Sequence, residues 1–531
     1  MSCDCMHDFI IIGAGSAGCV LAARLTETRR HSVLLLEAGG PDAHPSIHVP
    51  IAFGTLFKTE HDWNYETEPQ AAVGGRRDYV PRGKVLGGSS SINAMVYQRG
   101  HASIYDGWAA AGSPGWSYAD LLPYFKKAQH QERGASEAHG TGGPLNVADL
   151  RELNPLSRAW VAAARELGLP VTDDFNAGNQ EGFGFYQVTQ KNGMRWSTAA
   201  AYLRPALARP NLSVATSAHV VRLIFEGRRC VGVVYEQGGV LHTARARCEV
   251  ILSAGAYNSP QLLMLSGVGS GSALAAHGIA VVHDLPGVGQ NLQDHMMAPV
   301  AYHSLQPITL AAAGAEDEQV KFQTEQRGML TSNVAEAGGF LKVHPSAPAP
   351  ELQFHFGPAW FLFHGQRNPD GHGFTALPGI VTPKSVGAVT LRSADPYAAP
   401  RIETNALSHP DDVAMLVEGI KIARRLIAAH AFDAYRGAEL APGPAAQSDA
   451  DLEAHVRATA QNMYHPVGTC KMGRGDGAVV DAELRVHGVT GLRVVDASIM
   501  PVIVNANTNA PTIAIAEKAA DLIRAAADAA H

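Results

Sequence analysis

Apolar runs separated by glycine-containing turns open the chain and predict a strand–helix–strand unit. Phe9 to Ile12 is a short apolar run of the kind that forms a buried strand. Three glycines follow, and Val20 to Leu25 then begins a helical pattern. The next apolar run, in SVLLLEAGG, predicts a second strand that closes at Glu37. This order is typical of an α/β unit built on a parallel sheet.

Apolar runs further along the chain predict more strands. They are Val214–Phe225, Gly232–Tyr235, Glu249–Leu252 and the run in LRVVDASIMP that begins at Leu492. Residues 255–269, GAYNSPQLLMLSGVG, predict a helix, and a terminal helix is expected over Pro511–Ala527. The chain therefore returns near its end to the pattern with which it began.

Between residues 302 and 391 the pattern changes to aromatic-rich strands such as LQFHF, punctuated by proline and glycine. This predicts a separate antiparallel sheet with one face toward a cavity, and Asp411–His430 predicts a helix beside it. We therefore expect an α/β fold of two interleaved units. A Rossmann-like nucleotide-binding domain takes residues 1–155, 195–300 and 465–531, and an α+β substrate domain takes 156–194 and 301–464.

The composition narrows the class of protein. Hydrophobic residues make up 46% of the 531 positions and charged residues 17%, which is typical of a globular protein with a large core. The net charge is −7 without a long basic run, so nucleic-acid binding is not expected. No apolar run is long enough to span a bilayer, and we expect no signal peptide. The six cysteines have neither disulfide-framework nor zinc spacing, which predicts free thiols, a reducing compartment and no metal site.

The strongest motif is the GxGxxG pattern of Gly13, Gly15 and Gly18, between the first strand and the first helix. Such glycines make a tight turn, let the backbone approach a pyrophosphate and allow close helix–strand packing. The helix that follows directs the positive end of its dipole at the phosphates. Glu37 stands about twenty residues further on, where an acid can bond a ribose 2′-hydroxyl. A dinucleotide site is favoured over a glycine turn without a ligand.

Two other segments contain residues that suit a ligand. In PRGKVLGGSSSINAMVYQRG, Gly87 and Gly88 allow close approach to a ligand, although an ordinary loop would also use them. Asp496 ends an apolar strand, where an acid can bond ribityl or ribose hydroxyls or simply cap a turn.

The C-terminal part contains candidate catalytic groups. His465, in NMYHPVGTCKMG, suits a general base because its ordinary pKa is near neutrality, but a structural hydrogen bond is the simpler interpretation. Asn509 is a good N-cap and Pro511 suits the first turn of the terminal helix, whose positive end could stabilise an anion. Asn507 lies outside that helix and is free for another role.

Together these segments resemble the glucose–methanol–choline (GMC) family of FAD-dependent oxidoreductases. GKVLGGSSSINAMVYQRG is similar to the family's first signature, residues 255–269 to the second, and LPGVGQNLQDH to another shared block. The likeness runs from Asp8 to about Ile523. It implies the GMC fold and FAD as cofactor. Some members tether FAD through a histidine where this chain has Ile92, which cannot form that bond, so the FAD is expected to be non-covalent.

The resemblance also implies where each part of FAD lies. The ADP half is expected at Gly13, Gly15, Ser16, Ala17, Gly18, Glu37 and Ala38, with the adenine near Val220. The isoalloxazine is expected along Asn93, Ala94, Met95 and Val96, close to Gly87 and Gly88. The pyrophosphate and ribityl region is expected at Asp496 and Ala497, and flavin N1 and O2 near Asn507, Pro511 and Thr512.

By the same resemblance, His465 and Asn507 are the catalytic pair, and His355 is the next candidate for the base. His465 accepts the hydroxyl proton, Asn507 holds the oxygen, and a hydride passes to flavin N5. Glu336 stands where choline-active members have an acid near the substrate cation, although relatives that act on neutral alcohols have it too. Trp360 and Phe361 form an apolar wall or half of an aromatic cage, or they pack in the core.

Within the family, the chain is similar to bacterial quinone-linked alkanol and polyethylene glycol dehydrogenases. We expect FAD-dependent oxidation of a primary alcohol to an aldehyde, with electrons passed to a quinone-type acceptor. The alternatives are a choline or sorbose-type sugar dehydrogenase, an alcohol oxidase that uses oxygen, and a flavin-containing hydroxynitrile lyase. A cytoplasmic location is expected, with peripheral contact to the inner membrane as a further expectation. The sequence does not define the oligomeric state.

Overall fold

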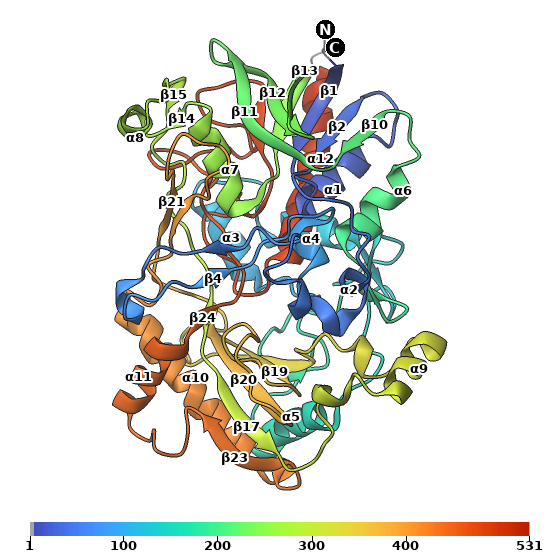
Figure 1. Cartoon of the computed structure of the whole chain (residues 1–531), viewed down its shortest axis with the longest axis vertical. Coiled ribbons are helices and arrows are strands. Elements are labelled where there is room, and N and C mark those ends of the chain that lie inside the picture. Colours follow the sequence, from blue (N-terminus) through green and yellow to red (C-terminus); the bar gives the residue numbers. More distant parts are fainter. Residues whose placement is uncertain (1–4, 530–531) are drawn as a thin grey trace.

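Two large sheets, one toward each end of the molecule, organise the computed structural model, which describes residues 5–529 (Figure 1). The first has seven strands in the order β10-β2-β1-β13-β12-β11, and β25 also pairs with β13. Their bounds are β1 (Cys5–Ile12), β2 (Val33–Leu36), β10 (Leu212–Ala215), β11 (Ala218–Glu226), β12 (Arg229–Gln237), β13 (Val240–Leu252) and β25 (Leu492–Val494). Strands β10, β2, β1, β13 and β25 pair in parallel, and β11, β12 and β13 form an antiparallel meander.

The first sheet brings together segments from the beginning, middle and end of the chain. Phe9, Ile10 and Ile11 of β1 are fully buried, as expected for a parallel strand covered on both faces. Helices α1 (Ser16–Leu25) and α12 (Asn509–Ala529) pack together on this sheet, and Figure 1 shows red α12 beside blue α1.

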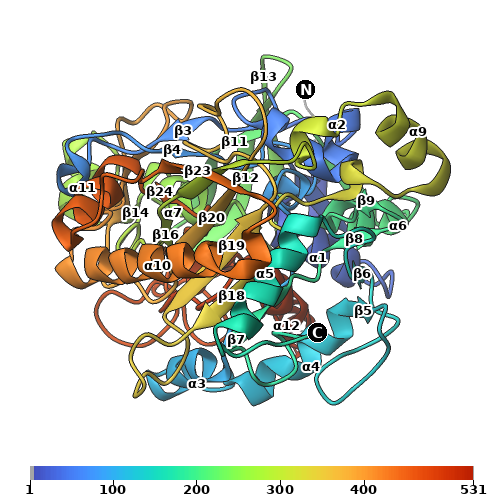
Figure 2. The ribbon, with the colours of Figure 1, turned by 90° about the horizontal axis from the view of Figure 1, so that it is seen from below.

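The second sheet has eight strands, in the order β23-β17-β20-β19-β18-β7, with β16 between β20 and β24. Every pairing within it is antiparallel. Helices α5 (Pro155–Glu166) and α10 (Pro410–Ala428) pack on it, as the view from below shows (Figure 2). The strands are β7 (Gly182–Phe185), β16 (Met296–Met297), β17 (Val300–Ser304), β18 (Ala337–Leu341), β19 (Leu352–Gly357), β20 (Gly373–Ile380), β23 (Arg436–Ala441) and β24 (Gln461–Asn462).

Shorter elements surround the two sheets. The other helices are α2 (Pro45–His48), α3 (Ala102–Ala110), α4 (Tyr118–Ala128), α6 (Arg204–Ala206), α7 (Gly255–Leu265), α8 (Gly271–Ala276), α9 (Glu316–Glu325) and α11 (Asp449–Thr459). Two-stranded sheets pair β3 (Tyr65–Glu66) with β4 (Tyr79–Val80), β5 (Gln129–Gln131) with β6 (Leu145–Val147), β8 (Gln190–Lys191) with β9 (Met194–Arg195), β14 (Val268–Gly269) with β15 (His283–Asp284), and β21 (Ala388–Thr390) with β22 (Arg401–Glu403).

The predicted fold class is confirmed, two local predictions are wrong, and one helix was not predicted. The run Val214–Phe225 is two strands, because the backbone turns at Ser217 with φ 51°. Helix α9 was not predicted; it has no buried residue and therefore no apolar period. Asn509 is the first residue of α12 rather than its N-cap. The predicted domain boundaries stay a prediction, although β16 and the start of β17 join the second sheet before residue 301.

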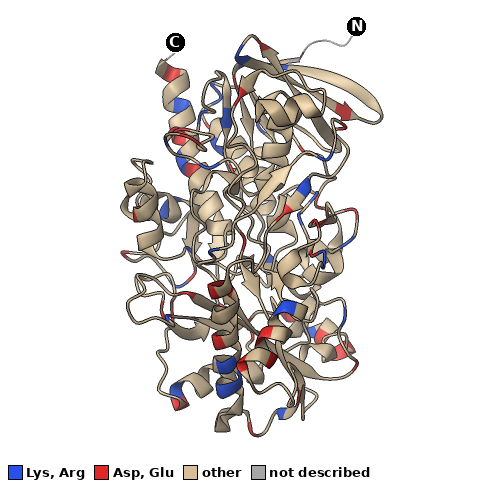
Figure 3. Cartoon of the chain, turned by 90° about the vertical axis from the view of Figure 1, so that its left-hand side faces the viewer, with Lys and Arg blue, Asp and Glu red and all other residues tan. Residues whose placement is uncertain are grey.

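Charged residues of both signs are interspersed along the helices and strands (Figure 3). Among residues 5–529, no helix is long and apolar enough to cross a membrane. Within the same residues, no group of histidine, cysteine and acidic side chains could hold a metal ion. Cys19, Cys230, Cys248 and Cys470 are free thiols, and Cys3 lies outside the described residues.

Candidate active site

A long cavity runs from the carboxyl edge of the parallel strands to the antiparallel sheet. Gly13, Glu37 and Val220 line the end at the first sheet, and His355 and Leu377 line the end at the second. The carboxyl edge of a parallel sheet is where open α/β folds bind ligands, because turns and helix N-termini converge there. The cavity therefore joins a nucleotide-type site to a second compartment.

The glycines at the first end are required by close packing. A Cβ on Gly18 would lie 1.9 Å from Gly13 O, so only glycine lets α1 pack on the turn before it. Gly88 has φ +52°, and a Cβ there would lie 2.7 Å from Gly15 Cα. At Gly15 a Cβ would meet no protein atom closer than 4.0 Å, and this glycine lines the cavity. Its side of the turn is thus open to a ligand.

Helix α1 presents its N-terminus to this cavity. Gly15 is its N-cap and makes no side-chain capping hydrogen bond, while Ser16 and Ala17 line the cavity. Uncapped N–H groups at a helix N-terminus bind phosphate oxygens well. The residues present therefore fit a dinucleotide pyrophosphate at this place.

Two buried carboxylates line the same region. Glu37 accepts hydrogen bonds from Ala14 N (2.8 Å) and Gly39 N (2.9 Å), and burial raises its pKa to about 7. Asp496 accepts hydrogen bonds from Gly255 N, Ser259 Oγ and Ser498 N. Both acids thus hold the turns around the cavity while they contribute to its lining.

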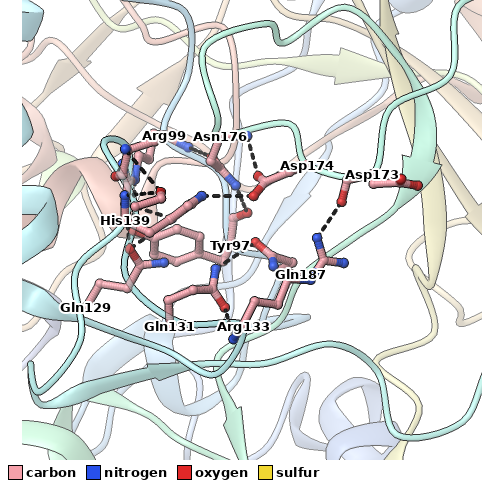
Figure 4. Close-up of polar contacts among 12 residues, drawn as sticks. Tyr97, Arg99, Gln129, Gln131, Arg133, His139, Asp173, Asp174, Asn176 and Gln187 are labelled. Carbon is pink, nitrogen blue, oxygen red and sulfur yellow. Dashed lines mark hydrogen bonds and ion pairs between the residues drawn. The ribbon is translucent and has the colours of Figure 1, made fainter.

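The segment Asn93–Val96 forms another wall of the cavity. Asn93 Oδ1 accepts a hydrogen bond from Met95 N (3.0 Å), and Met95 has the left-handed φ of 58°. The chain then enters a buried polar cluster, in which Arg99 donates to Tyr97 Oη (3.1 Å) and to Gln129 Oε1 (2.6 Å) (Figure 4). The side-chain hydrogen bonds of Arg99 therefore go to residues outside this wall.

Asn507 and His465 meet at the second end of the cavity. Asn507 Nδ2 lies 3.1 Å from His465 Nε2, and Gln353 Nε2 donates to Asn507 Oδ1 (2.9 Å). The amide orientation makes Asn507 Nδ2 the donor, so His465 Nε2 is the acceptor and the imidazole proton is on Nδ1. His465 Nδ1 lies 3.0 Å from His295 Nδ1, which accepts that proton's hydrogen bond. The lone pair of His465 Nε2 is therefore directed at the side of Asn507.

Burial keeps these imidazoles neutral. It lowers the pKa of His465 well below the ordinary value, that of His295 to about 3 and that of His355 to about 4. A neutral imidazole can accept a proton, which a general base must do. His465 is fixed further because its backbone N–H donates to Asp294 Oδ1 (2.8 Å).

Apolar residues form much of the remaining wall of this compartment, and Thr375 and Tyr464 also line it. The apolar residues among its lining are Phe53, Phe57, Met297, Phe361, Leu377 and Met463. The rings of Phe53 and Phe361 lie 6.4 Å apart. Such walls exclude water and suit an apolar substrate chain.

Most of the predicted site residues line this one cavity. They are Gly13, Gly15, Ser16, Ala17, Glu37, Ala38, Gly88, Asn93, Ala94, Met95, Val96, Val220, Asp496, Ala497, Asn507, Thr512, His465, His355 and Phe361. Gly18, Gly87 and Pro511 are not in its lining. Gly18 and Gly87 support it from behind, since Gly87 N donates to Ala14 O (2.7 Å).

Two predicted substrate residues are not brought to the cavity. Glu336 is 1% exposed, and its carboxylate accepts hydrogen bonds from Ser157 Oγ, Ser332 Oγ and Asn154 N. Trp360 packs edge-on against His303 with ring centres 5.0 Å apart. Trp360 and Phe361 therefore do not form one aromatic cage.

Sequence reasoning missed His295 and Gln353, the partners of the catalytic pair. His295 ends the block LPGVGQNLQDH and Gln353 lies in LQFHF, both of which were recognised without a role for these residues. Both are fully buried polar residues, a signal that only the structure gives. They fix the tautomer and the amide orientation on which the site depends.

Known proteins that are similar to this chain agree with a cavity that combines a dinucleotide site with a general base. The family model described as GMC oxidoreductase matches residues 7–297 and 383–516. An alcohol dehydrogenase [acceptor] of Pseudomonas putida is 47% identical over 98% of this chain and 96% of its own length. The mitochondrial choline dehydrogenase of Mus musculus is 48% identical over 98% and 89%.

Solved structures agree as well. Pyridoxine 4-oxidase from Mesorbium loti superposes with a TM-score of 0.90 at 32% identity, covering 97% of this chain and 98% of that one. A variant of formate oxidase from Aspergillus oryzae RIB40 gives a TM-score of 0.94 at 28% identity over 100% of both chains.

Fold and site thus define a flavin-dependent oxidoreductase that acts on CH–OH donors. The chain belongs to the GMC oxidoreductase family, and FAD is its cofactor.

Proposed function

We propose that this protein oxidises primary alcohols with an apolar chain to aldehydes and passes the electrons to a quinone-type acceptor. The observation that supports this best is the His465–Asn507 pair at the end of a compartment with apolar walls. The similarity to an alcohol dehydrogenase [acceptor] supports the acceptor class. A membrane quinone would bring the protein from the cytoplasm into peripheral contact with the bilayer.

The residues of the chain have distinct tasks in this proposal. His465 Nε2 accepts the hydroxyl proton, and Asn507 Nδ2 donates to the alcohol oxygen and holds it beside the base. His295 and Gln353 keep both groups in these orientations. Phe53, Phe361 and their neighbours exclude water and contact the substrate chain.

FAD would be held from the end of the cavity at the first sheet to the wall Asn93–Val96. The α1 N-terminus and Glu37 suit its ADP half, and the wall Asn93–Val96 suits its ring system. When bound, FAD supplies the hydride acceptor for the alcohol carbon.

Choline is the second candidate substrate, because choline dehydrogenases are among the relatives. Within the described residues, Glu37 and Asp496 are the only carboxylates that line the cavity, and both accept hydrogen bonds from backbone N–H groups, of Ala14 and Gly255 respectively. A quaternary ammonium in the second compartment would therefore have no carboxylate partner, and its recognition would depend on the aromatic rings of Phe53, Phe57 and Phe361.

The substrate class can be tested with a panel of hexanol, benzyl alcohol, choline and sorbose. We expect anaerobic bleaching of the flavin by the apolar alcohols and reoxidation by a quinone analogue. Choline preferred by about tenfold, or about 1.4 kcal/mol in transition-state binding, would overturn the substrate proposal. Hydrogen peroxide formed as fast as the quinone is reduced would indicate an oxidase, and the absence of bleaching would favour a lyase.

We also propose that the FAD is not covalently bound. Ile92 lines the cavity and has no atom that could form a bond to the flavin. Acid precipitation should therefore leave the yellow colour in the supernatant. Denatured apoprotein mixed with free FAD is the control, because it shows how much unbound FAD the precipitate retains. Colour that stays with the washed pellet beyond this amount would contradict the proposal.

A further inference from the structure

Arg195 is a buried arginine without a carboxylate partner. Arg195 is only 2% exposed, and its Nη2 makes no hydrogen bond. Among residues 5–529, no acidic oxygen lies within 4.0 Å of its nitrogens. Burial lowers the pKa of Arg195 to about 9, which leaves the group charged at neutral pH. A buried charge without a partner is costly to the fold, so its place calls for an explanation.

The guanidinium joins three segments at the back of the cavity wall. Its Nε donates to Ile47 O (2.6 Å) in α2. Its Nη1 donates to Ser90 O (3.1 Å) and to Asn93 Oδ1 (2.9 Å). Asn93 is the one of these three acceptors that lines the cavity.

The bond to Asn93 fixes which end of the amide is free. Asn93 Oδ1 receives N–H groups from both Arg195 and Met95. No hydrogen bond joins Asn93 Nδ2 to another described residue. With its oxygen held by the protein, Asn93 can present only its N–H₂ donor to a ligand.

We propose that Arg195 is a positioning residue for the flavin, which orients the Asn93 donor toward the cofactor and places an unneutralised positive charge behind the wall Asn93–Val96. The inference rests on the proposed position of FAD along this wall. Because a flavin gains negative charge on reduction, a nearby fixed cation stabilises the reduced form more than the oxidised form. Arg195 thereby raises the reduction potential of the bound cofactor.

Two substitutions separate the charge from the hydrogen-bonding geometry. Arg195→Met removes both, and we expect the equilibrium constant for two-electron reduction of bound FAD to fall about tenfold, which corresponds to about 30 mV. Arg195→Lys keeps the charge but cannot make the same fork of bonds. It should hold the potential near that of the wild type while the dissociation constant of FAD rises.

Arg99 provides the matched control. It is also fully buried and donates to neutral acceptors, but its neighbour His139 lies 2.8 Å from Asp174 Oδ2, and none of its bonds goes to a cavity-lining residue (Figure 4). Arg99→Met should lower the melting temperature without moving the potential. A potential that shifts equally in both methionine variants would show a general effect of destabilisation and overturn the proposal.

The measurements are FAD affinity, by titration of apoprotein, and midpoint potential, by dye equilibration with dithionite. Neither measurement uses an alcohol, so both remain valid if the proposed alcohols are not substrates. Wild-type protein that binds no FAD would instead overturn the proposed function. An unchanged potential in folded Arg195→Met overturns the inference. If Arg195→Met does not fold, the test uses Arg195→Lys. An unchanged FAD affinity in Arg195→Lys would also overturn the inference.

Discussion

Replacing His465 with alanine should slow anaerobic flavin reduction by roughly two or more orders of magnitude, because general-base help is worth about a hundredfold to ten-thousandfold. The imidazole is neutral through burial and its Nε2 lone pair is directed at the side of Asn507. Stopped-flow measurement of flavin bleaching with the best alcohol of the panel gives the rate directly. FAD content should stay near that of the wild type, since the ADP half is held at the other end of the cavity.

His355→Ala is the matched comparison for this experiment. His355 lines the same compartment and is neutral through burial, but no hydrogen bond joins it to Asn507 or His465 in the described residues. We expect its loss to cost much less. Reduction of the His465 variant at close to the wild-type rate, together with a slow His355 variant, would assign the base to His355.

Replacing Gly15 with alanine should weaken FAD binding while leaving the apoprotein folded. The added Cβ meets no protein atom closer than 4.0 Å, but it stands on the open side of the turn where the pyrophosphate is expected. Overpacking costs about 1–3 kcal/mol, so FAD affinity should fall roughly tenfold or more. The absorbance ratio of flavin to protein after gel filtration measures the loss.

Two other glycines provide the controls. Gly18→Ala puts a Cβ 1.9 Å from Gly13 O, so this variant should lose both FAD and apoprotein stability. Gly107 lies inside α3, where the added Cβ of Gly107→Ala meets nothing within 4 Å, so this variant should keep its FAD and be at least as stable as the wild type. Full FAD occupancy in Gly15→Ala, with a normal melting temperature, would refute the expected position of the pyrophosphate.

The elements that carry the nucleotide end could be predicted because their signals are local. Phe9–Ile12 became part of β1, the glycines became its turn, and the terminal helix formed over Asn509–Ala529. In a parallel sheet with both faces covered, strands are continuous apolar runs, which a single sequence displays plainly. The predicted antiparallel sheet was equally visible in LQFHF, which lies in β19.

The second compartment could not be predicted in the same way, because its walls come from segments far apart in the chain. Met297, Leu377 and Met463 form one apolar cluster, yet nothing in their local sequence distinguishes them from core residues. The prediction that Glu336 lies near the substrate depended on the family resemblance. In the structure, three hydrogen-bond donors hold its carboxylate away from the cavity. Partner choice among buried polar groups is a property of tertiary packing.

The contact between α1 and α12 has a consequence for biosynthesis. Ser16 Oγ donates to Asn509 Oδ1 (2.7 Å), and Arg24 pairs with the fully buried Glu517 (2.8 Å), in each case across 493 positions of the chain. These contacts between α1 and α12 therefore form only after the last segment has left the ribosome. Closing so large a loop is slow, and the unfinished sheet edge is exposed in the meantime. We therefore expect stable FAD binding to begin only after α12 has packed against α1.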